Sequence, residues 1–165
     1  MKFHHVVLVA IVMCMLAQGI YYYPRLPDRV ASQFDAVGHP GGWVTRTGFF
    51  VFEGAVVAGM TVLVLFLEWL VPRMPASRVS LPNKDYWLAP ERRAATDLMI
   101  QRWSATFLLL SLGFVVYVMQ LALLVNVTGD SAYMFVPMWA GLGAFLLLAT
   151  ALSVQLIRQF RKPRE

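Results

Sequence analysis

The chain contains a single cysteine, Cys14, and three histidines among its 165 residues. One thiol cannot form a disulfide within the chain or supply a cysteine-based metal site. The sequence also contains no glycine-rich phosphate loop, no His-Glu-x-x-His pair and no Gly-x-Ser-x-Gly elbow. These absences exclude disulfide-stabilised folds and the enzyme classes that those motifs mark, and we expect no cofactor.

Charged residues are scarce as well. They make up 14% of the chain, whereas a soluble domain carries about a quarter, and 59% of the residues are hydrophobic. The apolar residues form four runs that approach or exceed the roughly 20 residues needed to cross a bilayer, at 5–22, 48–71, 103–125 and 134–157. The sequence therefore predicts an all-α integral membrane protein, with residues 1–165 forming one domain of four transmembrane helices.

Basic residues are distributed unevenly among the connections between these runs. Eleven of the 14 lysines and arginines precede the first run, lie between the second and third, or follow the fourth. The other three are Arg25, Arg29 and Arg46, between the first and second runs. Since cytoplasmic loops carry the excess of Lys and Arg, we expect both termini and the central connection in the cytoplasm. The net charge of +5 then reflects membrane orientation, and we expect no nucleic-acid partner.

The connection between the first two runs has the pattern of a small outer hairpin. Residues 30–34 alternate in polarity, Gly38 can adopt the positive φ of a turn, and residues 43–45 can return beside the first strand. An isolated two-stranded hairpin is marginal in water. We therefore expect Phe34 and Trp43 to pack on the helix ends or in the headgroup layer.

The second run contains two acidic residues, Glu53 and Glu68. Their separation of fifteen positions places them within about 60° of each other around a helix and about 22 Å apart along it. Thr61 lies on the same side. This intramembrane polar line predicts either a face directed into the bundle or, for each glutamate, a place at an interface beside a base such as Arg73.

The connection at residues 81–93 is the largest polar one, and it is rich in aromatic, charged and proline residues. Two prolines stiffen its borders, so we expect an ordered structure packed against the cytoplasmic helix ends. A helix should start at its second proline and continue into the third span. The candidate binding residues here are Pro82, Asn83, Lys84, Asp85, Tyr86, Trp87, Pro90, Glu91, Arg92 and Arg93.

The histidines do not predict a metal site. His4 and His5 are adjacent, so a helix directs them about 100° apart, which suits chelation poorly. His39 lies alone in the outer connection and should be solvated.

Small residues at a spacing of four indicate where membrane helices approach each other closely. Ala55 with Gly59, and Ala140 with Ala144, have this spacing. The last two runs are joined by the short segment 126–133, so they should form an antiparallel helical hairpin.

Two tracts resemble a known family. Residues 26–30, 34–38 and 42–43 resemble the outer-loop signature of a bacterial domain of unknown function found at the N-terminus of the sporulation-delay toxin immunity protein. Residues 83–87 and 89–93 look like the cytoplasmic motif of the short members of that group. The candidate residues of the first tract are Pro27, Phe34, Asp35, Gly38 and Trp43.

Two departures limit what this resemblance implies. Gln33 stands where the family is expected to have histidine, which weakens a proton- or metal-based role for the outer loop. The chain also lacks the additional spans of the full immunity protein, so immunity itself does not carry over. The resemblance implies a multi-pass protein of the bacterial cell membrane.

Three functions are compatible with these features. The first is non-enzymatic recognition, sensing or immunity-like binding through the two polar loops, with a protein or peptide partner, a second copy of the chain and the lipid bilayer as partners. The second is a subunit of an oligomeric transporter or channel with Glu53, Thr61 and Glu68 on a polar route. The third is a membrane enzyme that uses Asp85 and Glu91.

Overall fold

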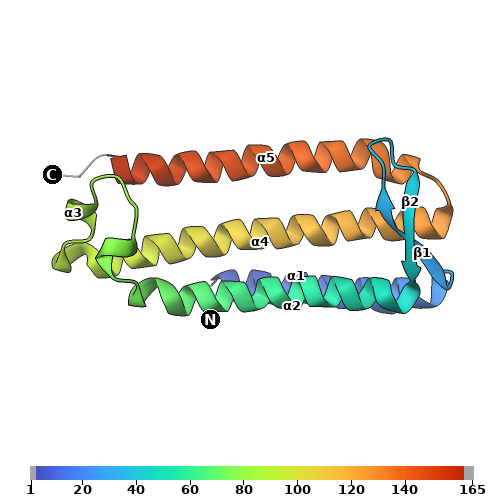
Figure 1. Ribbon diagram of the computed structural model, residues 1–165, viewed down its shortest axis with the longest axis horizontal. Coiled ribbons are helices and arrows are strands. Elements are labelled where there is room, and N and C mark those ends of the chain that lie inside the picture. Colours follow the sequence, from blue (N-terminus) through green and yellow to red (C-terminus); the bar gives the residue numbers. More distant parts are fainter. Residues whose placement is uncertain (1–2, 162–165) are drawn as a thin grey trace.

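The computed structural model of the protein describes residues 3–161, and four long helices determine its elongated shape (Figure 1). These helices are α1 (Phe3–Tyr22), α2 (Arg46–Leu70), α4 (Pro90–Thr128) and α5 (Ala132–Arg161). Each contains a window apolar enough to cross a membrane, which confirms the predicted number of spans.

Local sequence signals define several of the helix ends. The Thr45 side chain accepts a hydrogen bond from the backbone N–H of Gly48 at 3.0 Å and so caps the start of α2. Pro72 follows the end of α2 in a single 3-10 turn, Val71–Arg73. Gly129, with φ of +73°, ends α4 in the left-handed conformation that glycine adopts most readily.

The helices do not form a closed bundle. Figure 1 shows α4 between α5 on one side and the α1–α2 pair on the other. The buried residues of the middle of the molecule come from α1, α2 and α4: Leu8, Val57, Leu109, Leu112 and Val116. In contrast, α5 packs along α4 and leaves much of its own apolar surface exposed, including Leu146, Leu147 and Leu148.

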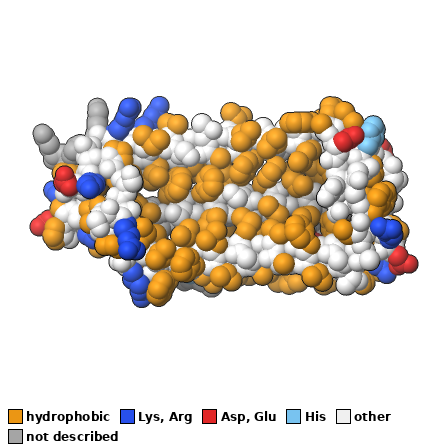
Figure 2. Space-filling model, viewed as in Figure 1, with side chains coloured by type: hydrophobic (Ala, Val, Ile, Leu, Met, Phe, Trp, Pro, Cys, Tyr) orange, Lys and Arg blue, Asp and Glu red, His pale blue; other side chains and the backbone are white. Residues whose placement is uncertain are grey.

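The exposed apolar surface is organised as a membrane protein requires. Figure 2 shows a broad apolar band across the middle of the visible face, with the charged side chains gathered at its two ends. Lipid tails can cover such a band without a hydrophobic penalty.

The third span is part of a much longer helix. Its 39 residues give α4 a length of about 58 Å at 1.5 Å per residue, nearly twice the roughly 30 Å of a hydrocarbon core. The predicted span at 103–125 is its apolar part, and the charged residues at 90–102 continue the same helix beyond it.

A two-stranded antiparallel hairpin covers one end of the helices, here named the hairpin end. It consists of β1 (Arg29–Phe34) and β2 (Pro40–Thr45), with Gly38 at φ of +91° in the turn. The opposite end carries the short helix α3 (Lys84–Trp87) within residues 81–93. We name residues 81–93 the clasp, and this end of the molecule the clasp end.

Close packing between α4 and α5 centres on a glycine outside the predicted small-residue pairs. A Cβ atom at Gly141 would overlap the ring of Tyr117, so the ring can occupy this position only beside a glycine. The Tyr117 hydroxyl donates to the carbonyl of Pro137 at 2.7 Å. Ala55 and Gly59, in contrast, are exposed, and a Cβ atom at Gly59 would meet no atom within 4 Å, so the predicted close approach does not occur at Gly59 within the described chain.

Candidate functional site

A large groove lies at the clasp end, between α3, the start of α4 and the last half of α5. Its volume is about 1460 Å³. The floor is apolar and includes Met99, Leu146, Leu147 and Val154. Arg92 and Arg158 line it as well, one from α4 and one from α5. The groove therefore combines an apolar floor with two fixed positive charges.

Neither of these two arginines forms an ion pair with a carboxylate of the described residues. Within residues 3–161, no Asp or Glu oxygen lies within 4.0 Å of the guanidinium of Arg92 or Arg158. The Arg92 guanidinium instead lies 4.0 Å from the centre of the Tyr86 ring, which holds it by a cation–π contact. An anion entering the groove would meet two guanidinium groups that remain charged at any physiological pH.

The clasp forms one wall of this groove because it is hydrogen-bonded to the end of α5. The Asn83 side-chain amide donates to the carbonyl oxygens of Phe160 and Arg161 at 3.3 and 3.1 Å. The Trp87 indole N–H donates to the Phe160 carbonyl at 3.1 Å. The last carbonyls of a helix have no partner within that helix, so these contacts cap α5.

The clasp is also fixed to α4 and to the segment after α2. The Trp87 carbonyl accepts a hydrogen bond from the Thr96 hydroxyl at 2.7 Å. Arg93 donates to the carbonyl of Met74 at 2.6 Å and to the carboxylate of Asp97 at 2.9 Å. Asn83, Trp87 and Arg93 are therefore structural. Asn83 is nevertheless exposed, and so are Pro82, Lys84, Asp85, Pro90, Glu91 and Arg92.

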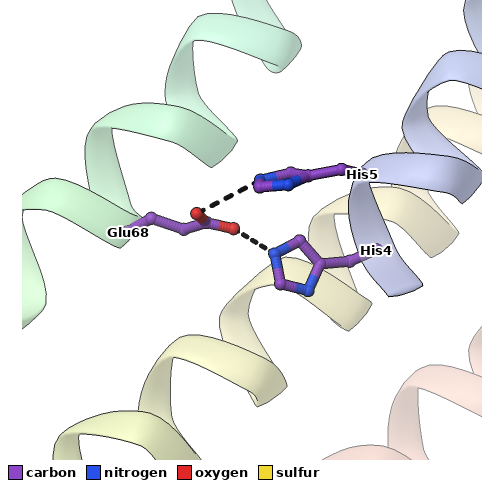
Figure 3. A group of neighbouring side chains, drawn as sticks. All are labelled: His4, His5 and Glu68. Carbon is purple, nitrogen blue, oxygen red and sulfur yellow. Dashed lines mark ion pairs between the residues drawn. The ribbon is translucent and has the colours of Figure 1, made fainter. Parts of the chain in front are cut away.

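A second group of polar side chains lies where the start of α1 meets the end of α2. Figure 3 shows Glu68 of α2 directed toward both His4 and His5 of α1. The His4 Nε2 atom contacts Glu68 Oε1, and the His5 Nε2 atom lies 3.3 Å from Glu68 Oε2. The side chains are partly buried, with 16%, 31% and 14% of the surfaces of His4, His5 and Glu68 exposed.

This arrangement corrects two expectations. The rings of His4 and His5 do not point apart as expected: their centres lie 4.5 Å from each other, and each ring meets one carboxylate oxygen of Glu68. Arg73, the base expected beside Glu68, donates to the carbonyl of Trp69 at 2.6 Å and lies over the Trp69 ring. Sequence spacing alone did not indicate the histidine contacts, because they depend on how α1 docks on α2.

A cavity of about 380 Å³ adjoins this histidine–glutamate group. Its lining includes His4 and Glu68 together with Gln101 and Arg102 of α4. The Gln101 side-chain amide donates to the backbone carbonyl of Glu68 at 2.6 Å, which attaches that turn of α2 to α4. The carboxylate therefore projects from a fixed backbone position toward a space that admits water or a small ligand.

The predicted polar line on α2 is interrupted. Glu53 is fully buried in the hairpin half of the bundle, and no hydrogen-bond partner for either of its oxygens occurs among the residues that the structure describes. The Thr61 hydroxyl donates to the Val57 carbonyl of its own helix at 2.8 Å. Val57 and Val64 are buried between the two glutamates, so a polar route from Glu53 to Glu68 is not present within the described chain.

The sequence analysis missed a polar group between α1 and α4. The Gln18 amide donates to the Gln120 side-chain oxygen at 2.9 Å, and the Gln120 amide donates to the Tyr22 hydroxyl at 2.6 Å. Glutamine is uncommon inside apolar runs, and the presence of Gln18 and Gln120 in two such runs could have indicated this polar contact. Such bonds join membrane helices and contribute about 0.6 kcal/mol on average.

The residues of the hairpin tract have separate roles. Phe34 packs against the buried cluster at the hairpin end, whereas Trp43 remains 53% exposed, and Pro27 is also exposed. A Cβ atom at Gly38 would lie 3.1 Å from the Cβ of Met134, so this glycine is needed for both its φ and its close approach to α5. These residues do not converge on one site.

Asp35 organises the turn of the hairpin. Its Oδ1 accepts hydrogen bonds from the backbone N–H groups of His39 and Val37 at 2.8 and 3.0 Å. Its Oδ2 lies 3.4 Å from Nδ1 of His39. The hydrogen bond from the His39 backbone lowers the pKa of Asp35 below its ordinary value. The charged carboxylate therefore shapes the turn.

Asn126 fixes the hairpin to the end of α4. Its side-chain oxygen accepts from the N–H of Ala31 at 2.6 Å, and its amide donates to the carbonyls of Ala31 and Ala122 at 2.9 and 2.8 Å. The Trp139 indole adds a bond from α5 to the Ala36 carbonyl at 3.2 Å. The hairpin is thus part of the helical framework.

Comparison with known protein families places a match in the first part of the chain. Residues 9–57 match a family described as Domain of unknown function (DUF1648). The matched range includes most of α1, the hairpin and the first half of α2, and therefore the tract at residues 26–43. No curated protein and no solved structure matches the chain. The clasp and the groove lie outside the match, which thus identifies an uncharacterised domain in the first third of a multi-pass membrane protein.

Proposed function

We propose that this chain is a non-enzymatic recognition protein of the bacterial cell membrane, and that the groove at the clasp end binds an anionic lipid. The observation that carries the proposal is the pair Arg92 and Arg158, which have no carboxylate partner in the described chain and line a groove with an apolar floor. A phospholipid has the matching chemistry, since it joins a phosphate to apolar chains.

The dimensions of the groove support a lipid. It runs along α5 from Gly143 to Gln159, which is about 24 Å at 1.5 Å per residue. One leaflet with its headgroups is about 20–22 Å thick. Leu146 and Leu147 are exposed within the apolar part of α5, whereas Arg158 lies in its last turn. The acyl chains of a lipid would contact the leucines, and its phosphate would lie near Arg158.

The orientation belongs to the same proposal. In the sequence, eleven of the 14 basic residues precede the first span, lie between the second and third, or follow the fourth, which favours placing the clasp and both termini in the cytoplasm. The groove arginines would then face the cytoplasmic leaflet, where anionic lipids create a negative surface potential. We favour binding over catalysis because both charged groups that line the groove are arginines, which cannot exchange protons in general acid–base chemistry.

Mass spectrometry of co-purifying lipid tests this proposal. The full chain is purified in mild detergent from a bacterial membrane, and its bound lipids are compared with those of an Arg92→Gln/Arg158→Gln variant. We expect anionic phospholipid to be enriched on the unmodified chain and to fall at least about tenfold in the variant, which corresponds to about 1.4 kcal/mol. Arg25→Gln/Arg29→Gln, which removes the same charge from the hairpin end, should retain the lipid.

Photocrosslinking distinguishes lipid from protein as the occupant. A photoreactive residue replaces Leu147, which is 74% exposed in the groove, and the masses of its adducts are measured in native membranes. Lipid-sized adducts that disappear in the Arg92→Gln/Arg158→Gln background support the proposal. A protein-sized adduct, or lipid enrichment that is equal in both arginine variants, would contradict it.

A further inference from the structure

We propose that His4, His5 and Glu68 form a binding site for a divalent transition-metal ion of the zinc class. This inference does not depend on the lipid groove, which lies between α3, α4 and α5, whereas the three ligands come from α1 and α2.

The spacing of the ligand atoms matches that of a tetrahedral metal site. Zinc–nitrogen and zinc–oxygen bonds of about 2.1 Å place two ligands about 3.4 Å apart at a tetrahedral angle. The His5 Nε2 atom lies 3.3 Å from Glu68 Oε2, and one ligand atom from each of the three side chains lies within 4.8 Å of the others. Small rotations of the side chains are sufficient to close the set around an ion.

The chemistry of the donors selects the class of metal. Two imidazole nitrogens and one carboxylate oxygen suit Zn²⁺, Ni²⁺ and Cu²⁺, whereas Ca²⁺ and Mg²⁺ prefer sets made of oxygen alone. Two neutral imidazoles and one carboxylate carry a net charge of −1, so a divalent ion leaves the site with only one positive charge. Two histidines with one glutamate form a ligand set found in zinc sites that keep one open position.

The adjoining cavity leaves room for a fourth ligand. Both His4 and Glu68 face this 380 Å³ space, which is large enough for water. Arg102 also lines it and adds a positive charge. That charge opposes a free cation in the cavity but favours an anionic fourth ligand, such as hydroxide or chloride, on the bound metal. The expected site therefore has three protein ligands and one exchangeable ligand.

Metal binding would join the start of α1 to the end of α2 at the clasp end. These helices are otherwise connected in sequence only through the hairpin at the opposite end. A ligand that binds the folded state and not the unfolded state raises the unfolding temperature. Zn²⁺ should therefore stabilise the chain, and the effect should require both helices to contribute ligands.

The test uses the full chain in detergent, purified through a C-terminal tag that contains no histidine and treated with a chelator. Zn²⁺ binding is measured by titration calorimetry, and the unfolding temperature is measured with and without the metal. We expect one equivalent of Zn²⁺ to bind, an increase in the unfolding temperature, and at least a tenfold loss of affinity in His4→Ala, His5→Ala and Glu68→Gln. Mg²⁺ should not reproduce the stabilisation.

His39→Ala is the matched control, because it removes a histidine from the hairpin end, where His39 lies near Asp35. Its Zn²⁺ affinity should equal that of the unmodified chain. Replacement of Zn²⁺ by Co²⁺ should produce the visible absorption bands of a tetrahedral site, and Glu68→Gln should change these bands even if it folds normally. Equal binding in the His4→Ala/His5→Ala variant, or the absence of stoichiometric binding to the unmodified chain, would overturn the proposal.

Discussion

The indole N–H of Trp87 donates a hydrogen bond to the carbonyl oxygen of Phe160 at 3.1 Å, and the two rings meet edge to face with their centres 5.3 Å apart. One side chain of the clasp thus both caps α5 and packs on a residue of its last turn that is 1% exposed. Trp87 therefore attaches the clasp to α5 by both a hydrogen bond and a ring contact.

Trp87→Ala should lower stability by about 2–3 kcal/mol, because it removes a hydrogen bond of about 1 kcal/mol, an aromatic pair of about 1 kcal/mol and apolar contact area. Trp87→Phe should lose about 1 kcal/mol, chiefly the hydrogen bond. Lys84→Ala, an exposed change in the same helical turn, should stay within about 0.5 kcal/mol of the unmodified chain. Thermal unfolding followed by circular dichroism measures all three. Equal stability of Trp87→Ala and Lys84→Ala would exclude the anchoring role.

The two neighbouring glycines of α5 should respond oppositely to alanine. Gly141→Ala places a methyl group in the ring of Tyr117 and should cost about 1–3 kcal/mol through overpacking. Gly143→Ala meets open space and should be neutral or stabilise by up to about 1 kcal/mol, because alanine is the better helix former. The unfolding temperature of Gly141→Ala should therefore lie below that of the unmodified chain, and that of Gly143→Ala should lie level with it or above. A stable Gly141→Ala variant would show that α4 and α5 can separate freely.

Substitutions of Glu53 test its position inside the bundle. Glu53→Gln retains the shape of the side chain without its charge and should fold as well as the unmodified chain. Glu53→Lys places a fixed charge within a span, where Lys costs about 2.5–3.5 kcal/mol at the helix centre. Expression level and unfolding temperature are the measurements. Normal values for Glu53→Lys would mean that this position reaches water or headgroups, contrary to its full burial.

The hairpin turn should weaken in acid. Because the pKa of Asp35 in the folded state is lowered from its usual 3.8, the stabilisation by its charge is complete above that value and is lost as pH falls through the folded pKa. Hydrogen exchange at the backbone amides of Val37 and His39, corrected for the intrinsic effect of pH on exchange, should therefore become faster as pH falls through the folded pKa of Asp35. Asp35→Asn should show no such titration, since its side-chain oxygen still accepts but carries no charge. Asp28→Asn is the control and should keep the acid effect. If the acid effect persists in Asp35→Asn, another group causes it.

Labelling of single cysteines tests the orientation. Gly38 and Trp87 are unsuitable positions, because one has a positive φ beside Met134 and the other packs on Phe160. Val37→Cys and Lys84→Cys, each in a Cys14→Ala background, use exposed positions at opposite ends. An impermeant reagent applied outside intact cells should label position 37 and not position 84. The reverse pattern would invert the topology.

The fold was predictable where one short-range signal was sufficient. The four spans follow from hydropathy, and the hairpin follows from its alternating residues around Gly38. The pairing of helices was less predictable, because an apolar run gives little information about which face meets a neighbour. Small-residue spacing indicated Ala55 and Gly59, yet the close approach occurs at Gly141.

The candidate sites depended more strongly on tertiary structure. The clasp was recognisable from its composition, but its attachment to α5 joins residues separated by more than seventy positions. The group formed by His4, His5 and Glu68 required the docking of α1 on α2 and the reach of flexible side chains. The angle of about 100° between adjacent residues of a helix did not predict this group, because one carboxylate contacts both histidine rings.

The clasp and the end of α5 are far apart in the sequence, and this separation affects the order in which the protein folds during synthesis. Trp87 precedes Phe160 by 73 residues, and Asn83 precedes Arg161 by 78. At about 5–20 residues per second, the ribosome needs several seconds to synthesise the intervening chain. During that interval α4 is synthesised first and α5 after it, so Trp87 and the arginines near it remain accessible to lipids and insertion factors until α5 is complete. Formation of the groove is thus a late event of biogenesis, completed when the last turn of α5 reaches the clasp.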